Sequence, residues 1–133
     1  MKYTEVEYNE LTKLVIKCAI EVHKELGPGL LESVYEICLI KLLREEGLDV
    51  KHQVKLPVYF RKEKLDKDFI LDILVNNVLI LEIKSIEDLQ PIHEAQLMTY
   101  LKLSNKKLGL LINFNVELLK DGIRRRINGD LNN

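Results

Sequence analysis

The sequence contains no tryptophan and only two cysteines and three prolines among its 133 residues. Cys18 and Cys38 each fall on the apolar stripe of an expected helix, and their spacing is neither that of a disulfide framework nor that of a metal motif. We therefore exclude a disulfide-stabilised fold and a zinc site, and we interpret both residues as buried free thiols.

Long apolar runs are also absent. No segment approaches the roughly 20 apolar residues that a membrane-spanning helix needs, and the first residues lack the apolar core of a signal peptide. We therefore expect a cytoplasmic protein with no membrane partner.

An excess of charge of one sign is missing as well, because the formal net charge is only -1. No global basic field would attract a nucleic acid, so such a partner would need a local basic patch. The best candidate is near the end of the sequence, where Lys120, Arg124, Arg125 and Arg126 crowd together. The alternative, of equal weight, is that these residues form a charged strand exposed to solvent.

Apolar residues make up 47% of the chain and charged residues 31%, which is the balance of a globular protein. The length fits one domain, which we expect to span residues 1–133. Apolar periodicity predicts helices at about 10–26, 30–46 and 91–104, the first capped by Asn9. It predicts strands at about 54–60, 68–75, 78–85, 108–114 and 122–128.

The strand at 108–114 is an unbroken apolar run, so we expect it inside the sheet and parallel to a neighbour, with the last strand at an edge. The first strand should be half-buried, with Val54, Leu56, Val58 and Phe60 alternating with polar neighbours. The order α-α-β-β-β-α-β-β predicts an α/β fold with a central mixed sheet flanked by helices.

Three charged residues interrupt otherwise apolar strands. Glu82 and Lys84 are two apart, so both leave the same face of the sheet, and Asp72 lies in the preceding strand. Charged residues in such strands are seldom buried without a partner or a metal ion. A strict two-residue turn would set Asp72 opposite Leu81, so we predict one extra loop residue that sets Asp72 opposite Glu82.

Two interpretations of these charges are open. Carboxylate oxygens converging on one point suit Mg²⁺ or Mn²⁺. The alternative is a buried salt-bridge network of Asp72, Glu82 and Lys84. Helix periodicity adds that His93, Gln96 and Tyr100 share one face of the third helix.

The sequence resembles the core motif of the PD-(D/E)XK nucleases, because Asp72 is followed by nine intervening residues and then by Glu82-Ile83-Lys84. The proline that opens the motif is absent, because Leu71 precedes Asp72, but this departure removes no ligand. The resemblance implies a restriction-endonuclease-like core.

The chain also resembles, nearly from end to end, the small bacterial family named for its GxxExxY motif. Gly29, Glu32 and Tyr35 stand at the motif positions. The stretch His93-Glu94-Ala95-Gln96 with Tyr100, and the run Gly109-Leu110-Leu111-Ile112-Asn113-Phe114, also look like this family.

The resemblance implies roles for these positions. Asp72 and Glu82 would bind Mg²⁺ or Mn²⁺, with the Ile83 carbonyl as a further ligand, and Glu32 resembles the helical acidic residue that completes the metal shell. Lys84 would orient or help to deprotonate the attacking water, which suits its single mobile ammonium group. Gln96 and Tyr100 resemble a Q-x-x-x-Y element of the exonuclease-like branch, and we count them among the catalytic residues.

Substrate contacts are expected from His93, Tyr35, Arg124, Arg125 and Arg126. For Tyr35 the alternative is a core position with its hydroxyl on a polar group near Glu32, and for His93 it is a polar contact at the helix N-terminus. We interpret His23 and His52 as structural or surface residues.

The resemblance thus implies a divalent-metal-dependent nuclease acting on DNA or RNA, with DNA ahead of RNA. One alternative is a catalytically silent nucleic-acid-binding or regulatory module on the same fold. The other is a structural or dimerisation unit whose apolar helical hairpin is the interface, and a homodimer is also compatible with a nuclease.

Overall fold

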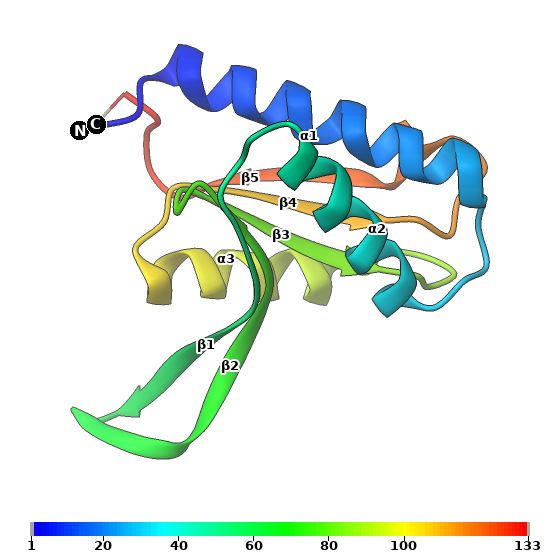
Figure 1. The fold of residues 1–133 in the computed structure, drawn as a ribbon. Coiled ribbons are helices and arrows are strands. Elements are labelled where there is room, and N and C mark those ends of the chain that lie inside the picture. Colours follow the sequence, from blue (N-terminus) through cyan, green and yellow to red (C-terminus); the bar gives the residue numbers. More distant parts are fainter. Residues whose placement is uncertain (1, 133) are drawn as a thin grey trace.

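The computed structural model describes residues 2–132, which form a five-stranded sheet with helices on both faces (Figure 1). The elements are α1 (Glu5–Leu26), α2 (Glu32–Glu45), β1 (Val50–Phe60), β2 (Glu63–Val75), β3 (Leu79–Lys84), α3 (Pro91–Ser104), β4 (Leu108–Asn113), a short 3-10 helix η1 (Leu119–Gly122) and β5 (Ile123–Ile127). The predicted fold class and the order α-α-β-β-β-α-β-β are confirmed.

The first helix begins earlier than predicted, at Glu5, and its N-cap is Thr4. The Thr4 hydroxyl accepts a hydrogen bond from the Glu7 backbone N–H, and the Glu7 carboxylate accepts one from the Thr4 N–H. Such a capping box satisfies two backbone donors that a helix start leaves free. The predicted cap Asn9 was therefore wrong, and its side-chain oxygen accepts instead from Arg125 Nη2 at 2.7 Å.

The sheet order is β1-β2-β3-β4-β5, with β3 and β4 parallel and the other neighbours antiparallel. The crossover from β3 to β4 runs through α3, as parallel neighbours require. All six residues of β4 are buried, and β5 lies at an edge, as predicted. Burial on both faces explains the unbroken apolar run of β4.

Two apolar clusters cover the two faces of the sheet. The larger packs α1 and α2 against one face, which includes Leu81 and Ile83, and contains Cys18, whereas Cys38 is only partly buried. The smaller packs α3 against the other face, which includes Ile80. A Cβ on Gly109 would lie 2.7 Å from Leu97 Cδ1, so the missing side chain lets α3 approach β4 closely.

The β1–β2 hairpin is longer than predicted and extends past the helices (Figure 1). Its ladder pairs Phe60 with Glu63 across the turn Arg61–Lys62, where both residues have positive φ. Because no helix covers this end, Phe60 is 61% exposed and does not face inward as predicted. Within residues 2–132, no helix is both long and apolar enough to cross a bilayer.

Candidate active site

The site begins at the β2–β3 connection. The strands pair Val75 with Leu79 and Ile73 with Leu81, so three residues, 76–78, join them. Asn76 and Asn77 both have positive φ, at 51° and 59°, which their short polar side chains tolerate. The predicted extra loop residue is confirmed, and continuing this register sets Asp72 opposite Glu82.

Asp72 lies where β2 separates from β3, because their ladder ends at Ile73 and Leu81. The backbone N–H of Ile83 donates to Asp72 Oδ2 at 2.8 Å. Here the Asp72 carboxylate takes the place of a backbone carbonyl as the acceptor for this N–H. Hydrogen bonds to a charged acceptor are stronger than those between neutral groups. This bond holds the Asp72 carboxylate against β3.

Glu82 projects into the interior on the α3 side of β3 and is only 4% exposed. Its Oε1 has no hydrogen-bond partner among the described residues. The pKa of Glu82 is raised to about 9. Burial is the largest cause and the negative charge of Asp72 is the next, while the positive charge of Lys84 acts in the opposite direction. A proton or a cation must therefore accompany this carboxylate near neutral pH.

Lys84 leaves the same face of β3 and is partly exposed. The ion pairs found within residues 2–132 do not include Lys84, Asp72 or Glu82. A buried salt-bridge network is therefore not the arrangement that these three residues adopt. The ammonium group is left available beside the two carboxylates.

Glu36 on α2 is a further acidic residue at this site, which the sequence analysis missed. Its Oε1 accepts from Gln53 Nε2 at 3.0 Å and lies 3.4 Å from His52 Nε2, so His52 is not merely a surface residue. Burial raises the pKa of Glu36 and the negative charge of Asp72 raises it further, while His52 and Gln53 lower it. A signal existed, because Glu36 shares the buried stripe of its helix with Ile40.

The predicted convergence of three acidic residues is not seen. Within residues 2–132, no three His, Cys, Asp or Glu side chains form a group that could hold a metal ion. Glu32 lies at the N-terminus of α2, where it lines a shallow hollow with Ser33 and Ser85. The structure does not bring Glu32 together with Asp72 and Glu82 in one group, and its part in a metal shell stays a prediction.

The two facing carboxylates nevertheless fit a divalent ion. Glu82 presents a buried, unpaired oxygen, and Asp72 is fixed beside it by its backbone bond. Such hard oxygen donors are those that Mg²⁺ and Mn²⁺ prefer. The backbone carbonyl of Ile83, which was predicted as a further ligand, belongs to the same strand as Glu82, β3.

On α3, Tyr100 and Gln96 differ in their surroundings. Tyr100 is buried, its ring lies 5.4 Å from that of Phe69, and its pKa is raised by burial and then by the charges of Glu82 and Asp72. Tyr100 is thus close to the acidic pair, whereas Gln96 is exposed.

Tyr35 and His93 make structural contacts. The Tyr35 hydroxyl donates to the Gly27 carbonyl at 2.6 Å and accepts from the Leu30 N–H at 3.1 Å, and its ring stacks on Phe114 at 4.5 Å. Because the side chain is fully buried, it has no surface for the predicted substrate contact.

His93 Nδ1 accepts from the Gln90 N–H at 2.8 Å, which is a polar contact at the start of α3. His23 is buried and places Nε2 2.7 Å from the Val116 carbonyl, in agreement with its interpretation as a structural residue.

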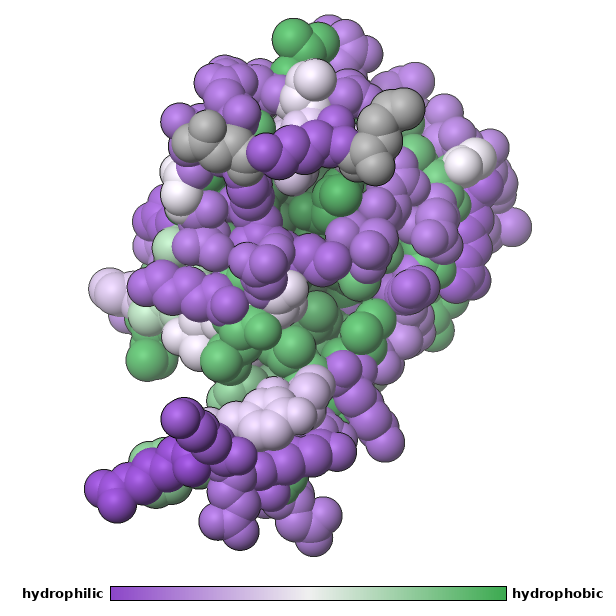
Figure 2. Space-filling model, turned by 90° about the vertical axis from the view of Figure 1, so that its left-hand side faces the viewer, coloured by the Kyte–Doolittle hydropathy of each residue, from purple (hydrophilic) through white to green (hydrophobic). Residues whose placement is uncertain are grey.

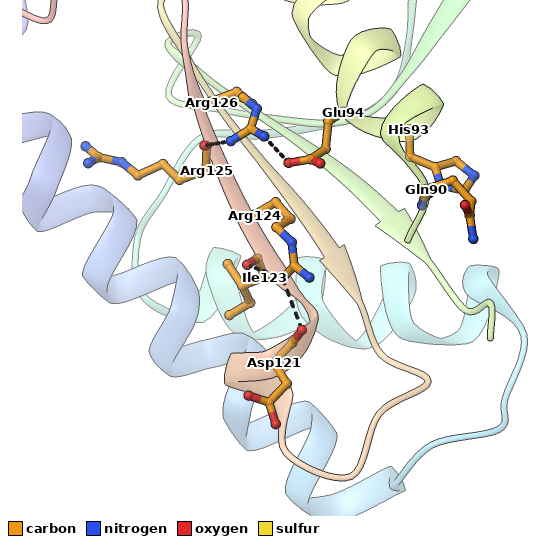
Figure 3. A network of polar contacts seen from close by, with 8 residues as sticks. All are labelled: Gln90, His93, Glu94, Asp121, Ile123, Arg124, Arg125 and Arg126. Carbon is orange, nitrogen blue, oxygen red and sulfur yellow. Dashed lines mark hydrogen bonds and ion pairs between the residues drawn. The ribbon is translucent and has the colours of Figure 1, made fainter. Parts of the chain in front are cut away.

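The three arginines of β5 do not form one patch (Figure 3). Arg126 pairs with Glu94 of α3, whereas Arg125 points to the other side and bonds Asn9 of α1. Arg124 donates to the Asp121 carbonyl at 3.1 Å. Neighbouring strand residues point to opposite faces, so the cluster seen in the sequence is divided by the sheet.

A sequence model of the PD-(D/E)XK nuclease superfamily matches residues 9–126, which include Glu32, Glu36, Asp72, Glu82 and Lys84. Neither the curated proteins nor the solved structures give a significant match. The match covers most of the chain, and the register of Asp72 and Glu82 agrees with it. The chain belongs to the PD-(D/E)XK nuclease superfamily.

Proposed function

We propose that this protein is a divalent-metal-dependent nuclease that hydrolyses phosphodiester bonds in DNA or RNA. The observation that carries the proposal is the buried Glu82 oxygen beside Asp72, which has no hydrogen-bond partner within residues 2–132, where Lys84, two residues further on, likewise forms no ion pair. Superfamily membership supports a nucleic-acid substrate.

Asp72 and Glu82 would hold Mg²⁺ or Mn²⁺, with the Ile83 carbonyl as a further ligand. The chemistry that such an ion supplies is polarisation of the phosphate and activation of water. Lys84 would orient the water and stabilise negative charge on the phosphate, because it leaves the same face of β3 as Glu82 and forms no ion pair within residues 2–132. Tyr100 would limit the access of bulk water from the α3 side.

Two helical acidic residues could complete the metal shell. Glu32 is the position implied by the GxxExxY motif, and assignment to that family is part of this proposal. Glu36 is the buried helical residue whose pKa is raised by the charge of Asp72. We therefore add Glu36 as the second candidate. Gln96 stays a proposed catalytic residue, and His93 and the β5 arginines stay proposed substrate contacts.

The proposal also includes a preference for DNA over RNA and a cytoplasmic location. It further includes the organisation as one domain over residues 1–133 and the homodimer.

The proposal is tested by metal binding and cleavage together. Calorimetric titration of Mn²⁺ into the wild type should show binding that the Asp72→Ala, Glu82→Ala double variant has lost. Lys84→Ala should lower cleavage of single- or double-stranded DNA or RNA by about 10²- to 10⁴-fold, because it removes a group that acts on the reacting atoms. Lys102→Ala, which changes an exposed lysine of α3, is the matched control. Normal cleavage by Lys84→Ala would refute the assignment.

One observation favours a second candidate, a nucleic-acid-binding module without activity. In the described part of the chain, no group of three or more His, Cys, Asp or Glu side chains is arranged to hold a metal ion. Nucleic-acid binding by the wild type without cleavage in either Mg²⁺ or Mn²⁺ would establish this candidate.

A further inference from the structure

The distal part of the β1–β2 hairpin, residues 55–70, forms an arm that projects from the body of the molecule (Figure 1). Except for Val58, every residue from Pro57 to Asp68 is exposed. The two strands remain paired up to Phe60 and Glu63, at a two-residue turn whose positive φ values suit the twist of a hairpin. The arm is thus an ordered element that the fold itself does not cover.

The arm is basic although the protein is not. Residues 55–70 contain five Lys and Arg against three Asp and Glu, a net +2, and since the whole chain carries -1 the remaining residues carry -3. Within residues 2–132, none of these five cations forms an ion pair. Figure 2 views the molecule from the side on which the arm projects and shows the arm, at the bottom, as largely hydrophilic. The unpaired cations make it an anion-binding surface, and its charge opposes pairing with a second arm.

The tip of the arm also exposes two aromatic rings. Tyr59 is 60% exposed and Phe60 is 61% exposed. The Arg61 guanidinium lies 5.4 Å from the centre of the Phe60 ring. Exposed rings interleaved with cations are typical of surfaces that bind single strands, because unpaired bases stack on the rings while cations contact phosphates.

The arm leads directly to the acidic residues. His52 and Gln53, near its base on β1, both contact Glu36, and Asp72 lies on the other strand of the same hairpin. A strand of nucleic acid that follows the arm from its tip would therefore reach the Asp72 and Glu82 pair. The acidic pair repels phosphate, so the affinity has to come from elsewhere.

We infer that the β1–β2 arm binds a single strand of nucleic acid, through its lysines and arginine to the phosphates and through Tyr59 and Phe60 to unpaired bases, and guides it to the acidic site. This inference deepens the proposed function, on which it rests for the cutting step.

Binding is measured by fluorescence anisotropy of a labelled oligothymidylate in EDTA, which separates binding from cleavage. In Lys62→Gln, Lys64→Gln, the slope of log affinity against log salt should fall in magnitude by about 1.4, since each single-strand phosphate contact contributes about 0.7. In Tyr59→Ala, Phe60→Ala, affinity should fall about tenfold or more with little change in that slope. The matched control is Lys13→Gln, Lys17→Gln on α1, which makes the same charge change at exposed positions away from the arm (Figure 1).

Equal effects of the arm and α1 lysine variants would overturn the inference, and so would failure of the wild type to bind the oligonucleotide. Tighter binding of a duplex than of the single strand would overturn the role of the aromatic rings. Thermal unfolding followed by circular dichroism checks that each variant is folded.

A small substrate, bis(p-nitrophenyl) phosphate, separates the two proposals because it is too short to reach the arm. Arm variants should hydrolyse it in Mn²⁺ as the wild type does, whereas Lys84→Ala should not. A wild type that binds the single strand through the arm but hydrolyses neither substrate supports the arm and refutes the nuclease. A wild type that hydrolyses the small substrate while the arm variants bind oligonucleotide normally refutes the arm alone.

Discussion

Glu82→Gln should remove a pH dependence of stability that the wild type shows when divalent ions are absent. The side chain is 4% exposed, and one of its oxygens has no hydrogen-bond partner in the described residues. Burial beside Asp72 raises its pKa from 4.5 to about 9. Glutamine has nearly the same shape and is neutral at every pH, so it keeps the packing and removes only the ionisation.

The sign follows from which state holds the proton. Between the unfolded value of 4.5 and the folded value of about 9, the folded protein keeps a proton on Glu82 that the unfolded chain has released. The free energy of unfolding is therefore highest below the unfolded value and decreases as pH rises through this window. One pH unit corresponds to about 1.4 kcal/mol, so the wild type should lose about 2.7 kcal/mol between pH 6 and pH 8 relative to Glu82→Gln.

Urea denaturation in EDTA at several pH values in this range measures the difference. Glu36, whose pKa is also raised, adds a decrease of the same sign to both proteins, so the comparison isolates Glu82. Glu32→Gln, which changes a partly exposed glutamate, should keep the wild-type dependence. If the free energies of unfolding of the wild type and Glu82→Gln changed in parallel with pH, Glu82 would already be ionised in the folded protein. This result would refute the reasoning. Mg²⁺ should restore stability at pH 8 in the wild type alone, because it binds the ionised form.

Three further predictions follow. Tyr35→Phe should lower the free energy of unfolding by about 0.5–1.5 kcal/mol, since it removes the hydroxyl that bonds the Gly27 carbonyl and the Leu30 N–H; an unchanged urea midpoint would contradict this. Gly109→Ala should cost about 1–3 kcal/mol because its Cβ would lie 2.7 Å from Leu97, and the double variant with Leu97→Ala should lose this added cost. Glu36→Gln should weaken Mn²⁺ binding more than Glu32→Gln in calorimetry, because Glu36 interacts with Asp72; the reverse order would favour the motif position.

Much of the fold could be predicted because its signals are local. The apolar run of β4 predicted burial on both faces, and Pro91 predicted the start of α3, which begins at that residue. Boundaries were less certain where two local signals competed. Thr4 and Glu7 form the capping box, and Asn9, which is also a good cap residue, lies inside the helix.

The candidate site was predictable for a similar reason. Asp72 and Glu82 interrupt apolar strands, and a charged residue in a buried strand is conspicuous without any knowledge of the fold. Glu36 escaped notice because a glutamate on an amphipathic helix is ordinary, and only the packing of α2 against β1 buries it. The β5 arginines were adjacent in the sequence, yet the alternation of the strand sends Arg125 and Arg126 to different helices (Figure 3).

The sequence by itself therefore determined the elements, their order and the two carboxylates that face each other across the β2–β3 hairpin, since periodicity and loop length decide these over a few residues. Only the tertiary structure decided that Glu36 contacts His52 and Gln53, that Glu32 stays apart, and that the hairpin continues as an uncovered arm. These features depend on the separation of β1 and β2 from the rest of the sheet and on where the helices end, because contacts between distant residues form only when whole elements pack against each other.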